Sequence, residues 1–82
     1  MTKKQKQELF AMLFHAKQDY IRRLKIYGST DEIVSIASAR VATLRAVVDL
    51  LELGKPYAEW ETEHAEKYAA MQQKRRERQA DA

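Results

Sequence analysis

Three residues that interrupt helices divide this 82-residue chain into three segments. Gly28 follows the first segment, and Gly54 and Pro56 lie close together after the second. Glycine ends helices readily because it adopts the left-handed conformation without a Cβ clash, and proline is tolerated in the first turn of a helix. The spacing predicts an all-α protein of long helices joined by very short turns, with almost no loop in which a reactive site could form.

Capping signals predict where the helices begin. Thr2–Gln5 and Ser29–Glu32 both fit a capping box, in which the first and fourth side chains accept hydrogen bonds from backbone N–H groups at the helix start. Because short connections favour antiparallel neighbours, the first two helices should form a hairpin. The expected helices cover residues of about 2–27, 30–53 and 56–78, followed by a frayed basic C-terminal end.

Length and composition bound the class of protein. Eighty-two residues form one domain, 1–82, near the size at which a single core is marginal. Hydrophobic residues at 45% and charged residues at 33% are typical of a foldable helical chain. No apolar run reaches the roughly 18 residues that span a bilayer, so no membrane association is expected. The absence of cysteine excludes disulfides and suits a reducing compartment, so a cytoplasmic location is expected.

The net charge of +3 is unevenly distributed along the chain. Residues 1–28 carry seven Lys or Arg against two acids, whereas 29–54 and 55–73 each carry two against four. The tail from Lys74 again has four basic residues against two acidic ones. The chain therefore has basic ends and an acidic middle, a pattern that bears on self-association and on the choice of partner.

The first two helices carry more apolar surface than they can bury against each other. At about 100° per residue, the first helix has two apolar ridges, the second of which consists of Phe10, Phe14 and Ile21. At about 25 cal/mol per Å², leaving several such side chains in water costs several kcal/mol, so something must cover them. The second helix has one broad apolar face made of Ile33, Ile36, Ala37, Val41, Leu44, Val47, Val48 and Leu51.

The third helix offers only a narrow apolar stripe. Tyr57, Trp60, His64, Tyr68 and Met71 lie along one edge, and the rest of the helix is heavily charged. The stripe could fold back over the hairpin and complete a three-helix bundle. Alternatively, the third helix could project, so that two hairpins meet as a dimeric helical bundle. Because one thin stripe covers less than the hairpin exposes, we favour a homodimer.

Two basic residues lie within apolar surfaces. Arg40 lies inside the apolar arc of the second helix, and Lys17 lies between the two ridges of the first. Such a residue must pair, extend its charged head to water, or face a partner, because a lone buried charge is costly. For Arg40 the pairing acid could be Asp19, Glu52 or an acid of another chain, and the alternative is a long stem over the core with its head in water.

No pattern in the chain predicts catalysis or a cofactor. Glu61-x-x-His64 has the spacing of metal ligands in di-iron helical proteins, but the first two helices supply no carboxylates at core positions to complete such a site. No nucleophile–base set and no Gly-rich loop for phosphate is present. We therefore expect a non-enzymatic protein without metal, cofactor or small-molecule substrate.

These features favour a small helical protein–protein interaction module that self-associates. Its class would be adaptor, assembly factor or inhibitor, of the kind that phages and mobile elements often encode. The residues expected at its protein interfaces are Phe10, Phe14, Ile21, Arg40, Tyr57, Trp60 and Tyr68.

The alternative is an accessory nucleic-acid-binding protein that uses its basic helix ends. Clustered Lys and Arg side chains neutralise phosphates without reading bases. The expected phosphate contacts are Lys3, Lys4, Lys6, Arg22, Arg23, Lys74, Arg75, Arg76 and Arg78.

Overall fold

Three α-helices make up the computed structural model, which describes residues 1–80. Their bounds are Lys3–Tyr27 for α1, Glu32–Leu50 for α2 and Gly54–Ala80 for α3. No strand occurs among the described residues, so the predicted all-α class with three helices is confirmed. None of these helices combines the length and the apolar character needed to cross a membrane.

The start of α1 matches the prediction from its sequence. The backbone N–H of Gln5 donates to the Thr2 hydroxyl at 3.1 Å, and the N–H of Thr2 donates to the Gln5 side chain at 2.9 Å. At the other end Gly28 has a φ of 83° and its N–H donates to the carbonyl of Leu24. The predicted capping box and the predicted glycine stop are therefore both confirmed.

The start of α2 differs from its predicted capping box. The N-cap is Asp31, whose carboxylate accepts a hydrogen bond from the N–H of Ile33 at 2.9 Å. The helix therefore begins at Glu32 instead of residue 30, and Ser29 and Thr30 belong to the turn. A carboxylate at the N-cap satisfies the same orphan N–H groups as a serine would, and it also complements the helix dipole.

The end of α2 also corrects the sequence prediction. The helix stops at Leu50, and Glu52, not Gly54, takes the left-handed conformation with a φ of 58°. The N–H of Leu53 donates to the carbonyl of Val48, and that of Glu52 donates to Asp49. These two bonds form a Schellman motif, and Leu53 packs near Val48 as that motif favours. Gly54 is thus left to begin α3.

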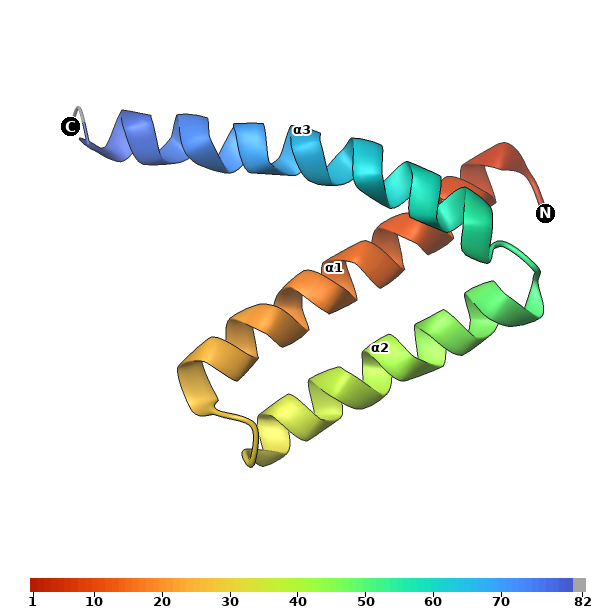
Figure 1. Ribbon diagram of the computed structural model, residues 1–82, viewed down its shortest axis with the longest axis horizontal. Helices are drawn as coiled ribbons and strands as arrows, with labels where there is room; N and C mark the ends of the chain where they lie inside the picture. The colour runs from red at the N-terminus through yellow and green to blue at the C-terminus, as the bar shows by residue number, and fades with distance from the viewer. Residues whose placement is uncertain (81–82) are drawn as a thin grey trace.

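The hairpin of α1 and α2 is antiparallel, as predicted, but α3 does not continue that pattern. Figure 1 shows α3 crossing over the N-terminal half of α1 instead of lying along α2. Beyond the crossing, α3 diverges from the hairpin and projects. From residue 69 to residue 79 every side chain is exposed except Gln72, which is half-buried. Thus the first half of α3 folds back over the hairpin and its second half projects.

The buried core is small for the length of the chain. It centres on Phe10, Leu13, Val48 and Tyr57, with five partly buried apolar residues packed around them. The radius of gyration is 14.9 Å, whereas a compact domain of this length has about 11.7 Å. The accessible surface is 6503 Å², whereas a compact monomer of 9.6 kDa exposes about 5,100 Å². The single chain therefore leaves about 1,400 Å² more surface in water than a compact fold would.

The Schellman motif at the end of α2 generates the first prediction. Glu52→Gly should raise the free energy of unfolding by roughly 0.5–1 kcal/mol, because glycine has no Cβ that clashes in the left-handed region. Urea unfolding followed by circular dichroism measures this change. Glu52→Ala is the matched control, since it removes the carboxylate but keeps the Cβ. An equal gain in both variants would show that charge, not backbone strain, limits stability at this turn.

Candidate protein interface

An aromatic cluster joins α3 to α1, and we call it the aromatic junction. At its centre the ring of Phe14 lies 4.8 Å from that of His64 and 5.5 Å from that of Tyr68, both edge-on. The rings of Trp60 and His64 stack at 4.4 Å with an angle of 10° between them. Edge-on and stacked pairs stabilise beyond the area that they bury. The junction consists of Phe10, Phe14, Tyr57, Trp60, His64 and Tyr68.

An ion pair between α1 and α3 lies beside the aromatic junction. The Lys17 ammonium donates to both oxygens of Glu61 at 2.8 Å, and it lies 5.8 Å from the centre of the Tyr57 ring. Burial works to raise the pKa of Glu61, but the hydrogen bonds from Lys17 outweigh it and hold that pKa below its ordinary value of 4.5. Burial, and then the Glu61 carboxylate, raise the pKa of Tyr57. Lys17 therefore pairs within the chain.

The aromatic junction contains most of the residues expected at a protein interface. Phe10, Phe14 and Tyr57 are buried inside the single chain, and Trp60 and Tyr68 are half-buried. In this conformation the rings of Phe10 and Phe14 contact α3, so they are not available to a partner. Of the predicted ridge on α1 only Ile21 is exposed, at 42%. The physical reason is the narrow stripe on α3, whose rings fit this ridge and cover it.

A different surface of the hairpin is apolar and uncovered. On α1, Met12 lies two residues from both Phe10 and Phe14, which turns it about 200° away from the face that α3 covers. Met12 is 57% exposed and Ile26 66% exposed. On α2 the exposed apolar side chains include Ile33, Ile36, Val47 and Leu51.

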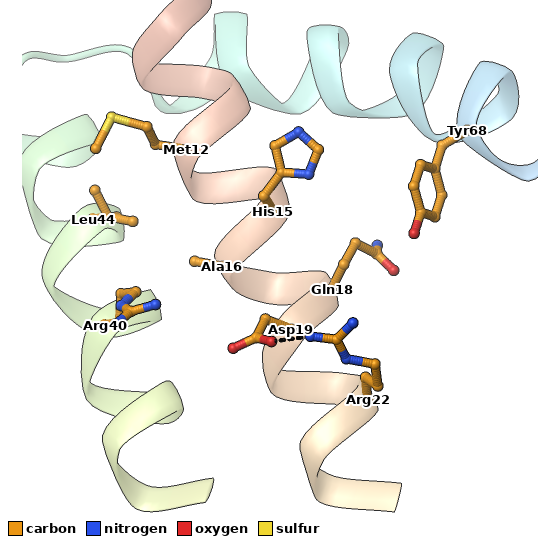
Figure 2. A pocket seen from close by; sticks show the side chains of 9 residues that line it. All are labelled: Met12, His15, Ala16, Gln18, Asp19, Arg22, Arg40, Leu44 and Tyr68. Carbon is orange, nitrogen blue, oxygen red and sulfur yellow. Dashed lines mark hydrogen bonds and ion pairs between the residues drawn. The ribbon is translucent and has the colours of Figure 1, made fainter. Parts of the chain in front are cut away.

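A groove runs between α1 and α2 on this surface and joins the two helices into one face. It encloses about 630 Å³ and is lined on α1 by Met12, Ala16 and Asp19, among others, and on α2 by Arg40 and Leu44. Figure 2 shows these side chains on either side of the small Ala16, whose size leaves the hollow open. At its far end His15, Gln18, Arg22 and Tyr68 complete the lining.

We call the surface around this groove the hairpin face. Positions seven residues apart lie two turns apart on the same side of a helix, and three- and four-residue steps fall close to that line. Asp19 is thereby aligned with Met12 and Ile26, and Arg40 with Ile33 and Val47. The hairpin face consists of Met12, Ala16, Asp19 and Ile26 on α1, and of Ile33, Ile36, Arg40, Leu44, Val47 and Leu51 on α2.

The charges of the hairpin face are Arg40 and Asp19. Arg40 is exposed and makes no ion pair with any residue from 1 to 80, so the predicted contacts to Asp19 or Glu52 are not formed within the chain. Asp19 forms an ion pair with Arg23 and accepts a hydrogen bond from Arg22, and these two guanidinium groups lower its pKa below the ordinary 3.8. Arg40 thus lies in an apolar surface with its head in water, as one of the two predicted alternatives has it.

The basic residues predicted to contact phosphate do not form one surface. Lys3, Lys4 and Lys6 lie near the start of α1, where α3 begins, whereas the cluster from Lys74 lies at the other end of the long α3. Arg23 is half-buried and is bound to Asp19 with Arg22. The two basic ends are therefore separate patches, each short of the continuous track that a phosphate backbone follows.

The geometry around the predicted Glu61–His64 pair is that of packing side chains. Glu61 is bound to Lys17, and His64 is stacked on Trp60. Within residues 1–80 no group of three His, Asp or Glu side chains is placed to hold a metal ion. Both residues therefore take part in holding α3 to α1.

Comparison with known proteins adds no assignment. The chain matches no protein-family model, no curated protein and no solved structure.

The sequence analysis missed two features, the Lys17–Glu61 ion pair and the hairpin face, although the sequence contains a signal for each. Lys17 and Glu61 carry opposite charges, and each lies beside apolar positions of its helix. Such a pair indicates an ion pair between the two helices. The hairpin face follows steps of four and three residues, as in a heptad repeat. Those steps connect Met12, Ala16, Asp19 and Ile26 of the face through Arg23 on α1, and Ile33, Arg40, Leu44, Val47 and Leu51 of the face through the buried Ala37 on and just after α2; Ile36 lies beside this line.

Burial of Phe14 in the aromatic junction predicts a large effect on stability. Phe14→Ala should lower the free energy of unfolding by about 3–5 kcal/mol, because it removes a ring that is 1% exposed and touches four other rings. Trp60, the single tryptophan, reports on the junction by fluorescence during urea unfolding. Ile21→Ala, on the same ridge but exposed, is the control and should cost about 1 kcal/mol or less. Equal losses in both variants would contradict this placement.

The lowered pKa of Glu61 predicts how stability depends on pH. A carboxylate with a depressed folded-state pKa stabilises the fold fully above its ordinary pKa and loses this contribution as pH falls through the folded value. Stability should therefore be flat from about pH 5.5 to about pH 9, below the ordinary pKa of Tyr57, and fall at lower pH. Glu61→Gln should make this decline shallower in urea unfolding at a series of pH values. Part of the decline should persist, since the pKa of Asp19 is also lowered. An unchanged slope would contradict the role of the Lys17–Glu61 pair.

Proposed function

We propose that this protein is a small non-enzymatic interaction module that self-associates and presents helical surface to a protein partner, as an adaptor, assembly factor or inhibitor does. The observation that carries the proposal is the surplus of exposed surface, part of which is apolar. A single chain exposes about 1,400 Å² more than a compact monomer of its mass, and a standard interface buries about 800 Å² on each partner. The surplus is therefore large enough for a specific interface.

The distribution of this surplus supports an interface on the hairpin. The end of α3 from residue 69 is exposed but mainly polar, so water solvates it well. The hairpin face, in contrast, exposes Met12 at 57%, Ile36 at 58% and Leu51 at 45%. A contiguous apolar patch on a small soluble chain marks an interaction surface. The α3 arm that projects beyond the hairpin then remains available to a further partner.

The core is also small enough for association to matter. Near 80 residues, one hydrophobic core supplies only a few kcal/mol of net stability, and many such chains rely on oligomerisation. Here only Leu13, Phe14 and Val48 have large side chains that are fully buried. Covering the hairpin face would extend this core along both helices.

The proposal predicts the mass of the protein in solution. Sedimentation equilibrium at tens of micromolar should give twice the 9.6 kDa of one chain. Ile36→Asp should shift the mass toward one chain and keep the helical circular dichroism, because the side chain is exposed in the monomer but would meet a partner. Ser38→Asp, also exposed on α2 but turned about 200° from Arg40, should leave the mass unchanged. A mass of 9.6 kDa at these concentrations would contradict the proposed self-association.

A further inference from the structure

We propose that a second copy of this chain binds face to face on the hairpin face, with the two-fold axis parallel to α1 and α2. In this arrangement α1 of one copy covers α2 of the other, and Arg40 of each copy lies opposite Asp19 of its partner. The inference deepens the proposed function and rests on it.

The charges of the hairpin face select the second copy as occupant. Arg40 has no carboxylate partner within residues 1–80, and its position in an apolar surface favours a contact that would supply one. The same face carries its own carboxylate, Asp19, and both residues line one groove. A carboxylate has about four acceptor sites, so Asp19 can accept a further donor beside Arg22 and Arg23. A face with one unpaired cation and one such acid is complementary to itself.

The positions of Asp19 and Arg40 along the helix axes are consistent with a contact between Arg40 of one copy and Asp19 of the other. Asp19 and Arg40 lie at the same groove, and α1 and α2 are antiparallel. A step of seven residues from Asp19 toward the start of α1, and one of seven residues from Arg40 toward the end of α2, therefore both lead about 10.5 Å in the same direction along the hairpin. This step places Met12 level with Val47. A two-fold axis parallel to the helices keeps each residue at its level and exchanges the two helices, so it brings Asp19 onto Arg40 and Met12 onto Val47.

The other face-to-face arrangement is disfavoured by the same charges. A two-fold axis perpendicular to the helices at the level of the groove would lay α2 on α2 and bring Arg40 close to Arg40. Like charges at a desolvated contact repel, and neither would gain a carboxylate. The apolar side chains alone would fit both arrangements. Arg40 is thus the residue that fixes the register, as a single polar residue in an apolar helical seam does in coiled coils.

Cross-linking of single-cysteine variants tests this arrangement, because the chain has no cysteine of its own. Met12→Cys and Val47→Cys both replace exposed side chains of the hairpin face. Oxidation of an equimolar mixture should give a covalent dimer of one Met12→Cys chain and one Val47→Cys chain, identified by mass spectrometry. Each variant oxidised alone should remain mostly uncross-linked. A mixture of Met12→Cys with Ser38→Cys is the matched control and should also stay uncross-linked.

A charge exchange provides a second readout of the same contact. Arg40→Glu alone and Asp19→Lys alone should each weaken self-association by tenfold or more, because each brings like charges together twice in the dimer. Mixing the two variants should restore dimerisation, because both contacts then pair opposite charges. Arg45→Glu, exposed on α2 outside the hairpin face, should change neither. Circular dichroism of each variant shows whether the helices are retained.

Different failures have different meanings. A dimer in which Val47→Cys cross-links with Ile33→Cys would overturn the proposed axis in favour of α2 lying on α2, because that axis brings positions seven residues on either side of Arg40 together. A dimer that cross-links as readily through Ser38→Cys would overturn the choice of face. Both results leave the proposed function standing. A wild-type protein with the mass of one chain would overturn the inference and self-association together.

Discussion

The aromatic junction between α1 and α3 is the contact on which the tertiary structure depends. The turn after α2 holds only the first residues of α3 near the hairpin, and the rest of α3 has no other means of choosing a direction. The ring of Phe14 packs edge-to-face with those of His64, Trp60 and Tyr68. Beside them, the Lys17 ammonium donates to both carboxylate oxygens of Glu61. These contacts make α3 cross α1 instead of running along α2, as Figure 1 shows. The position of every other surface follows from that crossing.

The crossing divides the hairpin into a covered and an uncovered side. Because α3 covers the ridge of Phe10 and Phe14, the side of α1 that carries Met12 and Asp19 is bordered by α2, with Tyr68 of α3 only at the far end of the groove. The groove there opens over Ala16, and Arg40 borders it without a carboxylate of its own. The packing of α3 on α1 thus both forms the core and determines which surface remains for the proposed second copy. Met12 and Ile26 of the proposed interface therefore lie on the side of α1 opposite Phe10 and Phe14.

Much of the local structure could be predicted from the sequence because it depends on neighbouring residues. The capping box of Thr2 and the helix end at Gly28, which has a positive φ, need only a few residues of context, and both predictions are confirmed. The turn after α2 was predicted wrongly, and the reason is again an interaction between residues close together in the sequence. Two residues compete for the left-handed position, and the packing of Leu53 near Val48 places it at Glu52 in spite of the Cβ. A glycine two residues further on is not close enough to replace it in that motif.

The candidate site was less predictable, since it depends on contacts between distant residues. The expected interface residues Phe10 and Phe14 are buried against α3, and Tyr57 of α3 is buried against the hairpin. Helical periodicity could not decide this, because it does not give the direction that α3 takes across α1. The sequence by itself determined that this protein consists of three helices with little loop, because local capping and the breaks near Gly28 and Gly54–Pro56 separate the helices within a few residues. Only the tertiary structure decided which side of α1 is covered by α3 and which side remains exposed. That choice depends on the direction of α3, which the paired rings and the Lys17–Glu61 contact set across 44 residues of chain.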